Sequence, residues 1–118
     1  LRLLRQVRSE TVKKQALVTG GASGIGRAVV QHLSQDHDVA VVDLQPLAGF
    51  RSFEADVRDL KRAQEIVSSL PRVDVLVTCA GINRDGPLDA SGGEQWHQVI
   101  DVDLTGTFNY LASVAAVM

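Results

Sequence analysis

The chain has 118 residues, enough for one compact core, and its 45% hydrophobic and 22% charged residues are ordinary for a globular domain. A net charge of −2 argues against nucleic acid or a membrane surface as a partner, and no apolar run is long enough to span a bilayer. The single cysteine, Cys79, cannot form an internal disulfide, which favours a cytoplasmic location.

Residues 1–13 form a basic lead-in in which arginines alternate with leucines. Such a stretch can be amphipathic or transit-like, but a disordered, solvated segment before the first strand is more common and is expected here. The chain begins with Leu and ends at Met118 inside an apolar, helix-like run, so both ends are predicted to be cut. We therefore expect one truncated domain over residues 14–118.

The first half of this domain alternates apolar strands with a helical pattern. A short buried strand is predicted at residues 16–18, and the helix that follows a glycine-rich loop runs to about residue 35. A second buried strand, 39–42, ends at Asp43. Residues 50–56 are predicted to be a third strand after a proline-containing loop.

The second half adds two helices and a strand. Asp59 is a predicted N-cap for a helix over residues 60–70, and the segment 73–81 is predicted to be a strand that enters a glycine turn. Ser91 and Glu94 have capping-box spacing before a long helix. The apolar residues of this helix are Trp96, Val99, Ile100, Leu104 and Phe108. Because continuous apolar strands are joined by helices, the order predicts an α/β fold with a doubly wound parallel sheet of about four strands.

The loop after the first strand, in the stretch LVTGGASGIGRAVV, contains Gly20, Gly24 and Gly26. In a βαβ unit this loop lies at the carboxyl edge of the sheet, where the next helix presents unpaired N–H groups and the positive end of its dipole. A pyrophosphate approaches such a backbone closely only if no Cβ blocks it. The glycines therefore predict a phosphate site in a Rossmann-type fold, with tighter packing of helix and strand as a further role for Gly26.

Asp43 closes the second strand, near the offset of about 20 residues expected for an acid that binds the adenosine ribose. A carboxylate there repels the 2′-phosphate of NADP, so NAD is the predicted cofactor and NADP is disfavoured. The alternative is a glycine turn followed by a chance acidic residue. Dinucleotide binding is favoured because strand, glycines, helix and acid coincide.

Four stretches together resemble the short-chain dehydrogenase/reductase family. TGGASGIG (19–26) is similar to its cofactor motif, ADV (55–57) to the pair that meets the adenine, TCAG (78–81) to its Asn-Asn-Ala-Gly, and VIDVDLTGTFN (99–109) to its long helix. The resemblance covers the chain from about residue 14 onward. Within the family, residues 82–88 are similar to 3-oxoacyl-acyl-carrier-protein and acetoacetyl-CoA reductases.

The resemblance implies a set of cofactor-binding residues. Those at the pyrophosphate are Gly20, Ser23, Gly24, Ile25 and Gly26; Asp43 holds the ribose, Asp56 and Val57 flank the adenine, and Ala80 and Gly81 pass beside the cofactor. For Val57 and Ala80, plain packing on the sheet is the alternative.

Three positions depart from the family pattern. Thr78 and Cys79 replace two asparagines, and Cys79 is expected to be a small buried hydrophobic residue rather than a nucleophile. Asp103 stands where the family has a helix asparagine linked to proton relay. If the relay uses the backbone carbonyl, Asp serves nearly as well.

The family's catalytic set is not complete in this sequence. Its Ser and its Tyr-x-x-x-Lys pair are absent, since the only tyrosine, Tyr110, has Val114 four residues later and is expected to be an ordinary helix residue. No metal site is predicted, because His32, His37 and His97 lack ligand spacing.

The resemblance thus implies the amino-terminal part of an NAD(P)-dependent oxidoreductase. The intact enzyme transfers hydride between nicotinamide and a small carbonyl or hydroxyl substrate, and it is expected to form a homo-oligomer through the long helix. The 118 residues alone are expected to be inactive. The alternative is a non-catalytic nucleotide-binding or oligomerisation module, and the reading frame downstream of Met118 discriminates between the two.

Overall fold

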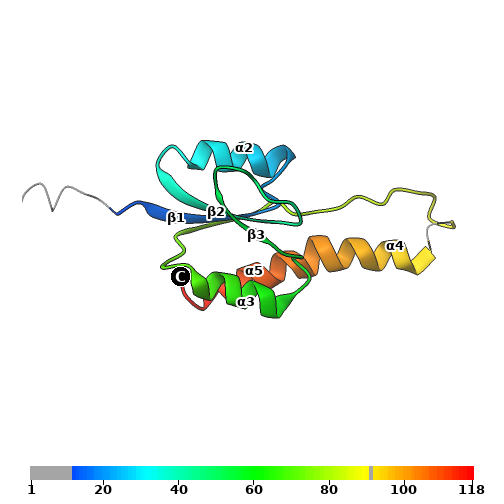
Figure 1. Ribbon diagram of the computed structural model, residues 1–118. Helices are drawn as coiled ribbons and strands as arrows, with labels where there is room; N and C mark the ends of the chain where they lie inside the picture. The colour runs from blue at the N-terminus through cyan, green and yellow to red at the C-terminus, as the bar shows by residue number, and fades with distance from the viewer. Residues whose placement is uncertain (1–11, 91) are drawn as a thin grey trace, which may run out of the picture.

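The computed structural model describes residues 12–90 and 92–118, whose strands form one parallel sheet in the order β3-β2-β1-β4 (Figure 1). The strands are β1 (Lys14–Thr19), β2 (His37–Asp43), β3 (Arg51–Glu54) and β4 (Val75–Thr78). The doubly wound α/β fold and its four strands are as predicted, although β1 and β2 are longer than expected and β3 and β4 are shorter. The carboxyl ends of β1, β2 and β4 meet at one edge, since Thr19 is paired with both Val42 and Thr78.

Helices cover both faces of the sheet. Helix α2 (Gly24–Leu33) lies on one face, and α3 (Leu60–Ser69) and α5 (Gly106–Ala115) lie on the other (Figure 1). Because successive strand residues point to opposite faces, β1 and β2 contribute to two separate hydrophobic clusters. Ala16, Val18, Val39 and Val41 pack with Val30 of α2, whereas Leu17, Ala40 and Val42 pack toward α3 and α5.

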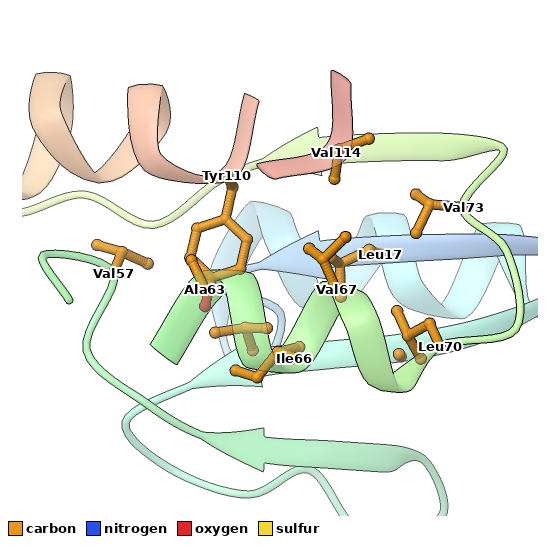
Figure 2. Close-up of a cluster of buried hydrophobic side chains, with 11 residues drawn as sticks. Leu17, Val57, Ala63, Ile66, Val67, Leu70, Val73, Tyr110 and Val114 are labelled. Atoms are coloured by element: carbon orange, nitrogen blue, oxygen red, sulfur yellow. The ribbon is translucent and has the colours of Figure 1, made fainter. Parts of the chain in front are cut away.

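Tyr110 of α5 fills the centre of the second cluster (Figure 2). It is fully buried against side chains of α3, including Ala63 and Ile66. Burial raises the pKa of Tyr110 to about 12. Its hydroxyl has no hydrogen-bond partner among the described residues. Tyr110 is therefore a core residue of a helix, as predicted, and not an exposed acid.

The prediction of a single long helix for the last part of the chain is wrong in one respect. Helix α4 (Gly92–Val99) passes into a π-helical segment, η1 (Ile100–Thr105), before α5 begins. A π turn holds more residues than an α turn, so it rotates the following face relative to the preceding one. Consequently Trp96 and Phe108 remain 67% and 61% exposed, while Tyr110 and Val114 are buried.

The predicted caps have different outcomes. The Asp59 N-cap is confirmed, because its Oδ1 accepts the N–H of Arg62 at 3.0 Å. The capping box involves Ser91, which lies outside the described residues. Residues 1–11 also lie outside them, so the disorder expected for residues 1–13 stays a prediction. Among the described helices, none is long and apolar enough to cross a membrane.

Candidate functional site

A cavity of about 590 Å³ lies at the carboxyl edge of the sheet, beside the first turn of α2. Its size is within the range of small-molecule sites. All ten residues predicted from the sequence line it: Gly20, Ser23, Gly24, Ile25, Gly26, Asp43, Asp56, Val57, Ala80 and Gly81. The structure adds Val42, Leu44, Ala55, Arg58, Cys79, Ile82, Arg84, Gln98 and Val102.

Two glycines of the loop are required by the packing of the chain itself. A Cβ at Gly20, where φ is +67°, would lie 2.5 Å from the Ala80 nitrogen, and a Cβ at Gly26 would collide with the Gly20 carbonyl oxygen. The packing role predicted for Gly26 is therefore confirmed, and Gly20 has the same role. Their contact with a phosphate stays a prediction. Gly20 and Gly26 let the loop, α2 and the segment after β4 come together, because no side chain fits between them.

Gly24 differs from these two. Its φ is +54°, and a Cβ built there meets no atom within 4 Å, so it would point into open space. Gly24 begins α2, whose N-cap residue Ser23 uses no side-chain oxygen to cap the helix. The first turn of α2 contains no acidic residue. This end of the cavity thus offers unpaired backbone N–H groups and the positive end of a helix dipole, which together attract an anion.

Asp43 is the last residue of β2, and its carboxylate is held by two backbone groups. Its Oδ2 accepts the Ala22 N–H of the glycine loop at 3.0 Å, and its Oδ1 accepts the Gln45 N–H at 3.0 Å. Its main-chain carbonyl accepts the Ala55 N–H at 3.0 Å. One residue therefore joins the glycine loop to the segment that leads to Asp56.

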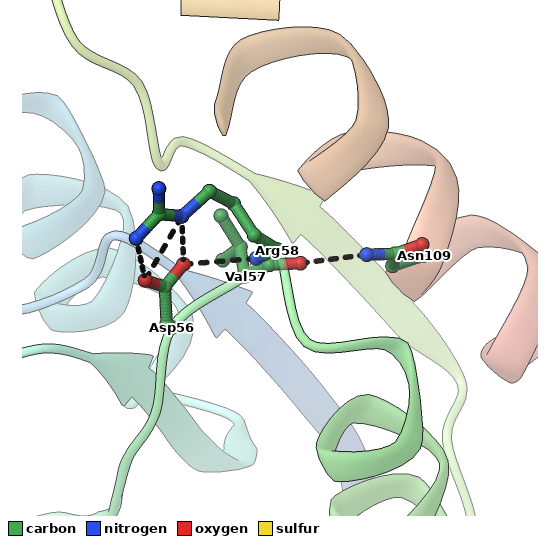
Figure 3. Close-up of polar contacts among 4 residues, drawn as sticks. All are labelled: Asp56, Val57, Arg58 and Asn109. Atoms are coloured by element: carbon green, nitrogen blue, oxygen red, sulfur yellow. Dashed lines mark hydrogen bonds and ion pairs between the residues drawn. The ribbon is translucent and has the colours of Figure 1, made fainter. Parts of the chain in front are cut away.

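The far wall of the cavity carries an ion pair between Asp56 and Arg58 (Figure 3). Asp56 accepts hydrogen bonds from Arg58 Nη2 at 2.6 Å, from Arg58 Nε at 3.0 Å and from the Arg58 backbone N–H at 2.9 Å. The side-chain hydrogen bonds from Arg58 lower the pKa of Asp56 below its usual value, so this carboxylate stays ionised.

Val57, between these two residues, is both a core residue and a cavity residue. It is 7% exposed and lies in the cluster around Tyr110. Its carbonyl accepts the Asn109 Nδ2–H at 2.9 Å, and a Cβ on Gly106 would lie 2.5 Å from its Cγ2. Val57 therefore packs in the core and also lines the cavity, and its contact with an adenine stays a prediction.

The segment after β4 forms the opposite wall. The Cys79 N–H donates to the Thr19 carbonyl at 3.0 Å, which extends the pairing of β4 with β1 toward the cavity. Cys79 was expected to be buried, but it is partly exposed and lines the cavity, because the chain turns away from the sheet here. Ala80 and Gly81 follow it along the same wall.

Asp103 lies in η1 and is hydrogen-bonded to the segment that forms this wall. Its Oδ1 accepts the Ile82 N–H at 2.8 Å, and its carbonyl accepts the Thr107 hydroxyl at 2.8 Å. It is not among the described residues that line the cavity. The side chain at the helix-asparagine position therefore holds the loop after Gly81, while the carbonyl at this position accepts a hydrogen bond from Thr107 of α5.

Sequence reasoning missed both cavity arginines, Arg58 and Arg84. Arg84 donates from Nη1 to the Asn83 carbonyl, within its own loop. No spacing rule points to either residue, although Arg58 directly follows the ADV stretch. Within residues 12–90 and 92–118, no group of three His, Cys, Asp or Glu residues is arranged to hold a metal.

Comparison with known proteins identifies the family. The model of the short chain dehydrogenase family matches residues 14–118. The chain therefore belongs to this family of proteins. It is 35% identical to 2,3-dihydro-2,3-dihydroxybenzoate dehydrogenase of Bacillus subtilis, over 89% of this chain and 47% of that protein. It is 34% identical to the 3-oxoacyl-acyl-carrier-protein reductase FabG of Staphylococcus epidermidis, over 91% of this chain and 52% of that protein. The chain thus spans about half the length of these relatives.

Solved structures give the same fold. Aldohexose dehydrogenase of Thermoplasma acidophilum superposes with a TM-score of 0.84 at 26% identity, over 90% of this chain and 44% of that chain. A short chain dehydrogenase of Leptospira borgpetersenii with bound NAD+ has a TM-score of 0.80 at 28% identity, over 92% and 47%. ElxO with bound NADP has a TM-score of 0.77 at 26% identity, over 89% and 50%.

Proposed function

We propose that this chain is the cofactor-binding part of an NAD-dependent short-chain dehydrogenase/reductase. The observation that carries the proposal is the cavity of about 590 Å³, which gathers the glycine loop, Asp43 and Asp56 at the carboxyl edge of a parallel sheet. In open α/β sheets, ligands bind at this edge where the strand order reverses. Here that point is β1, because β2 lies on one side of it and β4 on the other.

The residues that line the cavity are suited to bind the separate parts of a dinucleotide. The free amides around Ser23 and Gly24 bind the pyrophosphate, since nothing occupies the space over Gly24. Ile25 and Gly81 also line the cavity. When bound, NAD supplies the hydride acceptor for an alcohol, or in its reduced form the donor for a carbonyl. The chain's own residues bind and orient the nucleotide.

NAD is favoured over NADP because of Asp43. Its carboxylate lies at the end of β2, where two backbone N–H groups fix its orientation. A 2′-phosphate placed beside this fixed negative charge is repelled. The relatives of known structure include proteins bound to NAD+ and to NADP, so the preference rests on Asp43 alone.

The substrate of the whole protein is proposed to be a small carbonyl or hydroxyl compound, in line with the names of its relatives, FabG among them.

A non-catalytic nucleotide-binding module is the second candidate. It is favoured by one observation, that Tyr110, the single tyrosine of the 118 residues, is buried in the core and does not line the cavity. The 118-residue chain alone is accordingly expected to bind NAD without oxidising or reducing substrate. The lone cysteine supports a cytoplasmic location.

Self-association through the helices is also proposed. The consecutive elements α4, η1 and α5 expose large apolar side chains, namely Trp96, Leu104, Phe108 and Leu111. Exposed apolar patches of this kind mark protein interfaces. Light scattering after size-exclusion chromatography should show a dimer or larger species that Phe108→Glu dissociates. Val12→Glu, at an apolar residue before β1 that is also exposed, is the matched control and should leave the oligomer intact.

Isothermal titration of the chain with NAD and with NADP tests the proposed cofactor role. We expect saturable NAD binding and weaker NADP binding. NADP binding as tight as NAD binding, or no binding of either, would overturn the proposal.

A further inference from the structure

Asp43 is well placed for a second task besides contact with a ribose. Resting on the proposed function, we infer that Asp43 is also a positioning residue, which holds the glycine loop in the conformation that receives the pyrophosphate. Two hydrogen bonds between described residues join this loop to β2. One is between backbone groups, from the Gly20 N–H to the Val42 carbonyl at 2.8 Å. The other, from the Ala22 N–H to Asp43 Oδ2 at 3.0 Å, depends on a side chain.

The Ala22 bond is important because of where it lies in the loop. Gly20 is additionally fixed by its contact with the backbone around Ala80, as the close approach at that glycine shows. Ala22 is two residues further on and directly precedes Ser23, the residue from which α2 starts. The orientation of the first free amides of α2 therefore depends on a bond that Asp43 accepts.

The positioning role leaves Asp43 able to bind ribose hydroxyls. An ionised carboxylate has about four acceptor positions, two on each oxygen. The Ala22 N–H uses one position on Oδ2, and the Gln45 N–H uses one on Oδ1. One position on each oxygen remains, which matches two hydroxyl donors. Because both oxygens are already held by backbone groups, the carboxylate needs no reorientation when a nucleotide binds.

A ligand without ribose hydroxyls separates the two roles of Asp43. ADP and 2′,3′-dideoxy-ADP are titrated into the 118-residue chain and into two variants, Asp43→Ala and Asp43→Asn. Both variants lack the negative charge, but only Asn retains an oxygen that can accept the Ala22 N–H. If Asp43 acted by charge alone, its removal would tighten the binding of an anionic nucleotide. The positioning role predicts the opposite sign.

We expect Asp43→Ala to weaken binding of 2′,3′-dideoxy-ADP by about tenfold, as for a lost hydrogen bond to a charged group. Asp43→Asn should weaken it less. Glu54→Ala is the control, because Glu54 is also acidic, pairs in register with Asp43 and does not line the cavity. Unchanged or tighter dideoxy-ADP binding in Asp43→Ala would overturn the inference and leave the proposed function standing.

Amide hydrogen exchange at Ala22, measured by NMR without nucleotide, tests the same bond independently of binding. We expect faster exchange in Asp43→Ala than in the wild type and in Glu54→Ala. Equal exchange rates at Ala22 in all three proteins would overturn the positioning role. Failure of the wild type to bind either nucleotide would instead overturn the proposed function, and the exchange rates would still decide the loop contact.

Discussion

A substitution at Gly24 best distinguishes whether the glycine loop is only a turn or also binds a phosphate. Its Cβ position is open and its φ is +54°, so Gly24→Ala adds one methyl group to the cavity and places an L-residue in the left-handed region. Gly49 is a matched control, because its φ is +85°, its Cβ position is also open, and it does not line this cavity. The strain of a left-handed residue with a Cβ is roughly 1–2 kcal/mol at either position.

The two variants should therefore lose similar amounts of stability. A loss of 1 kcal/mol lowers the melting temperature of a domain of about this size by roughly 4–8 °C. Only Gly24→Ala should also weaken the binding of NAD, because its methyl group displaces a phosphate from the backbone amides at the start of α2. Loss of one hydrogen bond to a charged group corresponds to at least about a tenfold weaker affinity.

Thermal melts and isothermal titration of both variants with NAD measure these effects. Far-UV circular dichroism should be the same for wild type, Gly24→Ala and Gly49→Ala. Equal NAD affinity in the two variants would contradict a phosphate site over Gly24, since the loop would then be a turn without contact to the ligand.

Three further predictions concern the core, a helix cap and the ion pair. Tyr110→Phe should leave the free energy of unfolding unchanged or raise it by up to about 1 kcal/mol, because the buried hydroxyl has no partner among the described residues. Asp59→Ala should lower it by about 1 kcal/mol, because the cap on the Arg62 N–H is lost; urea denaturation measures both. Asp56 has a lowered pKa when folded, so its pairing with Arg58 stabilises the fold above the usual pKa of 3.8, and this stabilisation is lost as the pH falls through the folded value. Carboxyl NMR should give a midpoint below 3.8 that rises in Arg58→Gln.

Each of these has a clear contrary result. A large loss of stability in Tyr110→Phe would mean that the hydroxyl has a partner. No loss in Asp59→Ala would mean that solvent caps α3 equally well. A midpoint of Asp56 at or above 3.8 in the wild type would mean that Arg58 does not hold the carboxylate in solution.

The positions of the cofactor loop and Asp43 could be predicted because their causes are local. Glycine spacing, an apolar strand before it and a helical period after it fix the loop at the carboxyl edge of the sheet. The separate tasks of Gly20 and Gly24 could not be predicted. They depend on what each Cβ would meet, and for Gly20 that is the backbone around Ala80, far away in sequence.

The long helix shows a second limit. Apolar residues at Trp96, Leu104 and Phe108 follow a helical period, and the same pattern serves a face packed on the core or a face left exposed. The π segment Ile100–Thr105 could not be predicted from the spacing of apolar residues, because this spacing does not distinguish a π turn from an α turn. The actual core contact of this region comes from Tyr110, which the pattern did not single out.

Hydrogen bonds that side-chain carboxylates accept from distant backbone groups could not be predicted from the sequence pattern either. The Asp43 bond to Ala22 and the Asp103 bond to Ile82 each join segments about 20 residues apart. Both acids were identified from their positions in motifs. Their partners are backbone amides, which every residue except proline carries, so no residue type marks them in the sequence.

The central claim is that NAD binds at the carboxyl edge of this sheet, over the glycine loop. The most direct test is an NMR titration of the isotope-labelled chain with NAD, followed through the backbone amides. We expect saturable shifts at Ser23, Gly24, Asp43 and Gly81, and none at Gly49 on the opposite edge. Shifts centred on α4 or at Gly49, or no saturable shift at the glycine loop, would contradict it.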